Sequence, residues 1–464
     1  MRDFRAQAHR LADWIADYLE HPQRFPVLSR VRPGDIRDRL PPTAPERGES
    51  FDAIFADFER LIVPGLTHWN HPGFFAYFAI TASAPGILAE FLSAALNQQA
   101  MLWRTSPAAT ELEEVTLAWL RTLIGLPPAF EGVIYDTASI STLHALAAAR
   151  EAAVPDVRGR GLAGRSDLAA RVYCGEHAHS SVDKAIILLG LGHDALIRIP
   201  ADGEFRMRPD LLARAIAADR AAGRLPLAVV ATVGSTSTTS VDPVSEIAVI
   251  CGRENIWLHV DAAYAGVAAM VPGFEWILRG ADGADSLVVN PHKWLFTPFD
   301  LSVLYCRRMD VLRQAFALTP EYLKTSEGTA GVRNLMDTGI QLGRRFRALK
   351  LWMVLRHFGA EGLRGALAEH VRLARTFAAW VDASERFERV APVPFSVVCF
   401  RLRGASDDRQ ARLLDSVNAT GEVFLSHTRL DGQYVLRLAI GNLATREAHV
   451  ARAWELLNAE AAAR

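Results

Sequence analysis

Apolar residues in the first 83 positions recur at helical spacing and predict helices joined by proline-rich connectors. One face of the first helix is formed by Ala8, Leu11, Ala12, Ile15, Ala16 and Leu19. A connector with several prolines follows over residues 27–45. Because so thin a segment cannot bury its own apolar stripes, we expect residues 1–83 to pack on another body, such as a second copy of the chain.

Between residues 84 and 350, short apolar runs alternate with helical patterns, which is typical of βαβ units and a mostly parallel sheet. The runs are nearly continuous, as in strands covered on both faces. They span residues 132–135, 170–173, 227–233, 256–260 and 287–289. Beyond residue 351, a long helical stretch precedes alternating runs at 395–402 and 434–440, which predict a small α+β domain. We therefore predict an α/β protein with parts at 1–83, 84–350 and 351–464.

The composition adds few constraints on partners. The formal net charge is -1, so bulk electrostatics favour neither nucleic acid nor an anionic membrane. No apolar run approaches the roughly 18 residues that cross a bilayer, and the N-terminal residues lack the apolar core of a signal peptide. The cysteines lie far apart, at Cys174, Cys251, Cys306 and Cys399. This spacing favours reduced thiols, and we expect a cytoplasmic protein.

Unusual polar residues follow four of the predicted strands. In open parallel sheets, ligands bind beyond the carboxyl ends of the strands. The segments after these strands are Asp136-Thr-Ala-Ser139, Ser235-Thr-Ser-Thr-Thr239, Asp261-Ala-Ala-Tyr-Ala-Gly266 and Pro291-His-Lys-Trp294. We therefore expect a site built from these four segments.

Lys293 and Asp261 are the candidates for covalent and electrostatic chemistry. A lysine just past a buried strand is a candidate imine-forming amine, although an isolated lysine there more often makes a salt bridge. Asp261 ends a neighbouring strand, and its buried carboxylate requires a cation or donors. A protonated pyridine nitrogen supplies that cation, and the small residues after Asp261 leave room for a flat ring. The alternative for Asp261 is a helix N-cap.

A second group of residues suits a phosphate and a ring. Thr137, Ala138 and Ser139 begin a helix whose free N–H groups form an anion site, although ordinary capping is equally compatible. Thr236, in a Ser/Thr-rich loop, could reach the same phosphate or a ring hydroxyl. His179 could lie flat on the ring and donate to a substrate carboxylate. The alternative, a metal pair with His177, lacks a third ligand, so no metal is expected.

Two glycine-rich stretches, at 159–164 and 190–195, imitate dinucleotide-binding motifs. The first does not follow a strand, and the second is followed by a strand-like run instead of a helix. We interpret both as loops.

Several motifs together resemble one known family. They are WNHPGFFAYF, SPAATELE, AHSSVDKA, HVDAAYAG, NPHKW, PEYLK, LGRRFRALK and VLRLAI. The sequence resembles the group II pyridoxal-phosphate decarboxylases, and among them the aromatic-L-amino-acid decarboxylases, over nearly its whole length. The resemblance implies the fold type I architecture of pyridoxal-phosphate enzymes. It also implies a homodimer with the active site at the subunit interface, where the N-terminal helices clasp the partner.

The resemblance also implies roles for individual residues. Lys293 carries pyridoxal 5'-phosphate as a Schiff base, Asp261 pairs with the pyridine nitrogen, and the ring lies between His179 and Ala263. The implied phosphate contacts are Ala138, Ser139, Asn290 and His292, and Thr236 falls near the cofactor. Tyr322, on a polar glycine-containing loop, is implied to protonate the substrate carbon after carbon dioxide leaves.

Implied substrate contacts are Trp69, Tyr77, Ile80, Met101 and Gly343, where a small residue leaves space for a bulky ring. This chain departs from the family at Ala79-Ile80, which replaces a common Pro-Thr, and at Asp136, which replaces a small neutral residue. A carboxylate facing a phosphate is unfavourable, so we expect Asp136 to point away or to meet a donor.

The expected activity is decarboxylation of an aromatic L-amino acid to its amine. One alternative is an aldehyde synthase of the same family, whose members often carry Phe at the position of Tyr322. A second is an aminotransferase, for which no carboxylate-binding arginine can be assigned from the sequence. A third, a binding protein without activity, does not require the intact set of Lys293, Asp261, His179 and Tyr322.

Overall fold

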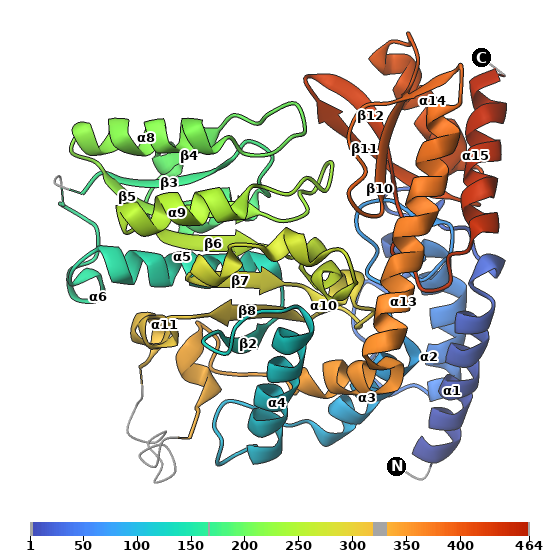
Figure 1. Cartoon of the computed structure of the whole chain (residues 1–464). Helices are drawn as coiled ribbons and strands as arrows, with labels where there is room; N and C mark the ends of the chain where they lie inside the picture. Colours follow the sequence, from blue (N-terminus) through green and yellow to red (C-terminus); the bar gives the residue numbers. More distant parts are fainter. Residues whose placement is uncertain (1–2, 166–167, 319–331, 463–464) are drawn as a thin grey trace.

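A seven-stranded sheet forms the centre of the large α/β part of the molecule (Figure 1). The computed structural model describes residues 3–165, 168–318 and 332–462. In spatial order the strands are β2 (Glu131–Tyr135), β8 (Ser302–Cys306), β7 (Ser286–Val289), β6 (Trp257–Asp261), β5 (Leu225–Thr232), β3 (Ala170–Gly175) and β4 (Leu196–Ile199). Strand β8 runs antiparallel to both of its neighbours, and β7, β6, β5, β3 and β4 pair in parallel.

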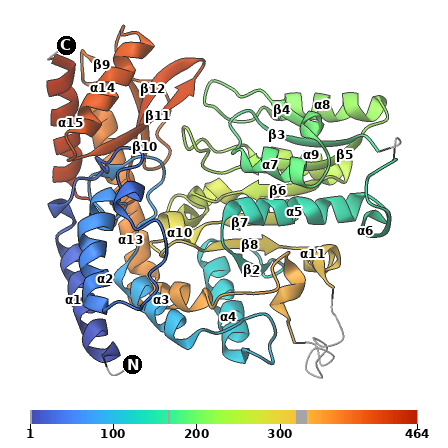
Figure 2. The same ribbon diagram turned by 180° about the vertical axis from the view of Figure 1, so that it is seen from behind.

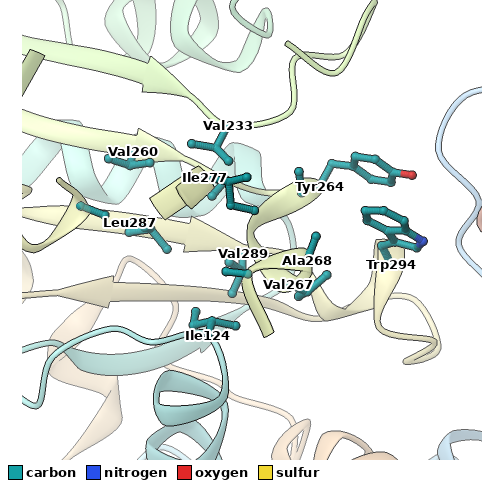
Figure 3. Close-up of a cluster of buried hydrophobic side chains, with 14 of the residues drawn as sticks. Ile124, Val233, Val260, Tyr264, Val267, Ala268, Ile277, Leu287, Val289 and Trp294 are labelled. Atoms are coloured by element: carbon teal, nitrogen blue, oxygen red, sulfur yellow. The ribbon is translucent and has the colours of Figure 1, made fainter. Parts of the chain in front are cut away.

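Helices cover both faces of this sheet, which explains the nearly continuous apolar strands. One face is covered by α5 (Ala138–Ala153), α7 (Ser181–Leu188) and α11 (Met309–Phe316), and the other by α4 (Pro107–Leu123), α8 (Pro209–Ala221) and α9 (Val244–Glu254). Side chains alternate between the two cores along each strand: Ala228 and Val230 of β5 face α5, whereas Val229 and Ala231 face away from it. Figure 3 shows part of the core on the face opposite α5, including Val260, Leu287 and Val289.

A second, five-stranded sheet organises the C-terminal part. Its spatial order is β1 (Phe74–Phe75), β11 (Phe424–Leu430), β12 (Gln433–Ala439), β10 (Val397–Leu402) and β9 (Phe387–Arg389). Helices α13 (Ala348–Asp382), α14 (Asp407–Ala419) and α15 (Glu447–Ala462) pack with it. Gly359, with a φ of 62°, interrupts the helical geometry of α13, a backbone conformation that glycine adopts without strain.

The N-terminal segment lies along the C-terminal part, as both views show (Figures 1 and 2). Its helices are α1 (Phe4–Glu20) and α2 (Phe51–Asp57), and α3 (Ala84–Leu96) follows and packs on α13. Strand β1 pairs in parallel with β11, so residues some 350 positions apart in sequence share one sheet. Two single-turn helices, α6 (Val157–Arg160) and α10 (Pro291–Trp294), belong to the large α/β part.

The predicted α/β class, the mostly parallel sheet and the predicted strands are confirmed, with ends shifted by at most two residues. The loop interpretation of residues 159–164 is partly wrong, because Gly159 and Arg160 lie in the single-turn helix α6. The antiparallel strand β8 was not anticipated. No helix in the described ranges combines the length and apolarity that crossing a bilayer requires.

Candidate active site

A cavity of about 210 Å³ lies where β5, β6 and β7 end and α5 begins. All ten residues that the sequence assigned to the cofactor line it: Thr137, Ala138, Ser139, His179, Thr236, Asp261, Ala263, Asn290, His292 and Lys293. A larger surface hollow of about 840 Å³, near Trp276 and Arg364, is lined by neither lysine nor histidine among the described residues. The smaller cavity is therefore the candidate active site, because it brings together a lysine, two histidines and a buried aspartate.

Lys293 enters the cavity from α10, the single helical turn that follows β7. The neighbouring His292 and Trp294 are buried and anchor this turn. The Lys293 Nζ atom lies 5.4 Å from the centre of the Phe78 ring. Burial lowers the pKa of Lys293; the Asp261 carboxylate opposes this effect, and the Arg437 guanidinium adds to it. A larger fraction of neutral amine makes Lys293 a better nucleophile than an ordinary lysine.

Asp261 ends β6 and provides the buried carboxylate of the cavity. Its Oδ1 atom accepts a hydrogen bond from the Ala263 N–H at 3.1 Å, and the side chain is only 6% exposed. A carboxylate so deeply buried is costly without a cation. The side chain therefore suits a cationic ring nitrogen, and the small Ala263 leaves room for the ring.

The N-terminal end of α5 is suited to binding an anion, and the Asp136 carboxylate lies directly before it. Asp136 Oδ1 accepts hydrogen bonds from the Thr137 N–H at 2.5 Å and the Thr137 hydroxyl at 3.1 Å. The expectation that Asp136 meets a donor is thus confirmed. The next two amides, of Ala138 and Ser139, belong to the first helical turn and have no partner within the helix. Asn290 also lines the cavity, and its buried Oδ1 atom has no hydrogen-bond partner among the described residues; this oxygen is an acceptor and does not itself bind an anion.

Two histidines present N–H donors to the cavity. His292 Nδ1 accepts the Leu301 N–H at 2.9 Å, and burial lowers the pKa of His292 to about 3, so the ring is neutral and its proton sits on Nε2. His179 Nδ1 accepts the Ser181 N–H at 3.1 Å, which likewise assigns the proton to Nε2. Each imidazole is therefore fixed as a donor through its outer nitrogen.

An aromatic stack that the sequence did not predict borders the cavity. The Phe78 ring stacks on Tyr264 at 3.7 Å, and Tyr264 stacks on Trp294 at 4.7 Å; Figure 3 shows the latter two rings facing each other. Arg437 lies on β12, and its guanidinium is 4.7 Å from the centre of the Phe78 ring. It donates to the carbonyl oxygens of Tyr77 and Ser237. The sequence gives one indication of Arg437, which is a charged residue within the apolar run VLRLAI. Other cavity residues not singled out are Thr232, Gly234 and Phe299.

The five expected substrate contacts do not line this cavity within one chain. Trp69 stacks on Phe74 at 4.3 Å, and Tyr77 is 55% exposed. Met101 lies beside Met336, Ile80 is partly buried, and a β-carbon added at Gly343 would lie 3.2 Å from the Gln99 amide nitrogen. Tyr322 lies outside the described residues. Within those residues, no cluster of three or more His, Cys, Asp or Glu side chains could hold a metal ion.

The residues present fit pyridoxal phosphate. Amide and imidazole donors gather at one end, and a buried carboxylate lies at Asp261. The nucleophilic amine of Lys293 opens into the same cavity. These groups match a phosphate, a cationic ring nitrogen and an aldehyde, respectively.

Comparison with known proteins agrees with this chemistry. The chain is 42% identical to aromatic-L-amino-acid decarboxylase of Sus scrofa, over 99% of this chain and 96% of that protein. It is 41% identical to phenylacetaldehyde synthase of Arabidopsis thaliana, over 98% and 95%. The crystal structure of Oryza sativa TDC with PLP and tryptamine matches with a TM-score of 0.96 and 38% identity, over 100% of this chain and 98% of that one.

These matches establish the fold type I architecture and the dependence on pyridoxal phosphate. Residues 33–403 match the family described as the pyridoxal-dependent decarboxylase conserved domain. The chain therefore belongs to the pyridoxal-dependent decarboxylase family.

Proposed function

We propose that this carboxy-lyase removes the carboxyl group of an aromatic L-amino acid as carbon dioxide and releases the corresponding amine, with Lys293 as the residue that holds the cofactor. The observation that carries the proposal is the shared cavity of Lys293, Asp261 and the first turn of α5. Relatives named for aromatic amino acids, at about 40% identity over nearly the full chain, support the substrate class.

When bound, pyridoxal phosphate supplies an aldehyde that condenses with amines and a cationic ring that accepts the electron pair left by the departing carboxylate. Lys293 would hold the aldehyde through its amine, whose pKa burial lowers, and would accept and return a proton during exchange with the substrate amine. Asp261 keeps the ring nitrogen positively charged by offering it a buried carboxylate. Ala138, Ser139, Asn290 and the Nε2–H of His292 hold the phosphate.

His179 and the substrate wall orient the bond that breaks. With the cofactor bound, His179 would cover one face of the ring and Ala263 the other, and Thr236 would reach the ring hydroxyl or the phosphate. The substrate ring is received by Trp69, Tyr77, Ile80, Met101 and Gly343. Because these five residues do not line the cavity of their own chain, we propose that a second copy supplies part of this wall in a homodimer.

An exposed apolar face on α3 supports the dimer. It consists of Leu88, Phe91, Leu92 and Leu96, each about half exposed. Contiguous apolar side chains of this kind usually mark an interface between proteins. The four cysteines are unpaired thiols, which supports a location in the cytoplasm.

Amine formation is proposed over aldehyde formation because position 322 is a tyrosine, the expected proton donor to the substrate carbon. Similarity alone does not separate the two outcomes, since the Arabidopsis synthase is as similar as the decarboxylases. The product therefore has to be measured.

The first test replaces Lys293 with alanine. Lys293→Ala is expected to abolish turnover and to leave no cofactor attached after borohydride reduction, because the nucleophilic amine is absent. Mass spectrometry of the reduced protein measures the attachment. Lys184→Ala is the matched control, since Lys184 is exposed and does not line the cavity. Attached cofactor in the Lys293 variant would remove the central assignment.

The second test identifies substrate and product. Tryptophan, phenylalanine, tyrosine and dopa are supplied separately, and carbon dioxide, amine, ammonia and peroxide are quantified. Carbon dioxide and amine in equal amounts support decarboxylation. Ammonia and peroxide would show the aldehyde-forming reaction, and a 2-oxo acid would show an aminotransferase.

A further inference from the structure

A row of buried polar side chains leads from the middle of β6 to the cavity. Trp257, His259 and Asp261 occupy alternate positions of this strand and therefore share one face. Trp257 packs in the core beneath α5, which identifies that face as the α5 side. Asp261 opens into the cavity, whereas His259 lies one step deeper and is 0% exposed.

Hydrogen bonds fix the tautomer of His259. The Trp257 indole N–H donates to Ser286 Oγ at 2.9 Å, and the same oxygen lies 2.9 Å from His259 Nδ1. An indole N–H only donates, so Ser286 Oγ accepts from Trp257, and among the described residues His259 Nδ1 is the acceptor within hydrogen-bond distance for the Ser286 hydroxyl proton. The ring proton of His259 then resides on Nε2.

That Nε2 atom is buried and has no hydrogen-bond partner among the described residues. Burial lowers the pKa of His259 to about 4, against an opposing effect of the Asp261 charge, so the ring is neutral and the two side chains interact. Their Cα atoms are separated by two residues of a strand, or about 6.6 Å. A buried donor without a partner is costly, and Asp261 is the charged acceptor on the same face.

We propose that His259 is a positioning residue that donates its Nε2–H to the Asp261 carboxylate through one buried water, since the two side chains make no direct hydrogen bond. This contact orients the carboxylate so that one oxygen faces the cavity, where the ring nitrogen would lie. The inference rests on the proposed function, because it concerns how Asp261 meets the cofactor. A core histidine with a purely structural role would instead affect only the stability of the sheet.

The experiment compares two ligands on apo-protein. Pyridoxal phosphate and its carbocyclic analogue, in which C–H replaces the ring nitrogen, are titrated into wild type, His259→Phe, His259→Gln and Asp261→Asn. Only pyridoxal phosphate has the ring nitrogen that can pair with the Asp261 carboxylate. Val172→Ala, a buried change on the same side of the sheet, controls for loss of stability alone.

His259→Phe is expected to weaken binding of pyridoxal phosphate about tenfold, at the lower end of the range known for outer partners of metal ligands. Binding of the analogue stays within about twofold, and His259→Gln, which keeps an N–H donor, restores most of the loss. In the Asp261→Asn background, His259→Phe adds no further loss. Equal loss for both ligands, or no loss for either, overturns the role of His259.

The Asp261→Asn variant distinguishes a failure of the role proposed for His259 from a failure of the role proposed for Asp261. If it discriminates between the ligands while His259→Phe does not, His259 is a structural residue and the proposed function stands. If Asp261→Asn itself binds both ligands with the wild-type ratio, the assignment of Asp261 fails instead. Nitrogen-15 chemical shifts of the apo-protein provide an independent readout, since Ser286→Ala should unlock the Nε2–H tautomer of His259.

Discussion

Asp136 places a carboxylate directly before the anion-binding turn of α5. Its hydrogen bonds to Thr137 occupy the first amide of that turn and hold the carboxylate one residue from Ala138. A negative charge at a helix N-terminus stabilises the empty helix but competes with a bound phosphate for the same positive end. We therefore expect Asp136 to stabilise the start of α5 and to weaken the binding of a phosphate there.

Asp136→Asn is expected to tighten binding of pyridoxal phosphate to the apo-protein. Removing one repulsion at a partly buried position is worth about 1 kcal/mol, or roughly fivefold in the dissociation constant. Equilibrium titration by absorbance measures the change, and Asp194→Asn, at an exposed position outside the cavity, is the control. Weaker binding in the Asp136 variant would mean that its hydrogen bonds to Thr137 organise the phosphate site.

Helix α3 shows how one element serves two surfaces. Its inner side packs on α13, and its Glu90 pairs with Arg345 at 3.0 Å and with the buried Lys350. Its outer side exposes the apolar face defined by Leu88, Phe91, Leu92 and Leu96. The polar pairs fix the helix to its own chain, which leaves the apolar face available to a partner.

Leu92→Glu is expected to convert the proposed dimer to monomer, because a two-fold interface would bury the new charge twice. Light scattering after gel filtration should give twice the chain mass of 50.9 kDa for wild type and the single mass for the variant. Leu188→Glu, on an exposed residue of α7, is the matched control. An unchanged mass for Leu92→Glu would place the interface elsewhere.

Across the whole molecule, an aromatic stack joins the two sheets through the cavity wall. The Tyr264 hydroxyl lies 2.5 Å from Ser396 Oγ, and the Trp294 indole N–H donates to His370 Nδ1 at 3.0 Å. Ser396 and His370 belong to the C-terminal part, whereas Tyr264 and Trp294 belong to the large part. The residue after Lys293 is therefore held between both parts, so the position of the amine depends on the complete fold.

Buried neutral histidines make stability sensitive to acid. Burial lowers the pKa of five of them to about 3 or 4, namely His71, His144, His259, His292 and His370. Between their unfolded pKa of about 6.5 and these values, only the unfolded chain takes up the protons, so stability falls as pH falls. Asp242, whose pKa burial raises to about 6, acts in the opposite sense, because its native carboxyl gains a proton in this range.

The urea midpoint of the apo-protein is therefore expected to fall steadily between pH 6.5 and pH 4. Each histidine contributes about 1.4 kcal/mol per pH unit, and five histidines outweigh one carboxyl. His144→Gln, which keeps an acceptor for the Ile340 N–H, should reduce the slope by about one proton. A midpoint that is constant over this range would show that the histidines are accessible to protons in the native state.

The sequence by itself determined most strands of the large sheet and the polar residues that follow them into the cavity. The apolar runs are local, and the residues that end them must gather where parallel strands end, so Lys293, Asp261 and the start of α5 could be found without coordinates. Strand β8 was not among the predicted strands, and its antiparallel direction could not be predicted either, because an apolar run that is buried on both faces carries no sign of its direction.

Only the tertiary structure decided which distant residues complete the site. Arg437 donates to the carbonyl of Tyr77, 360 positions away, and Ser286 fixes His259 from a neighbouring strand. Such pairs arise from sheet pairing and domain docking, which depend on long-range packing and leave no local pattern in the chain. For the same reason, the sequence could not show that the five expected substrate contacts lie outside the cavity of their own chain, where we propose that a second copy completes the wall.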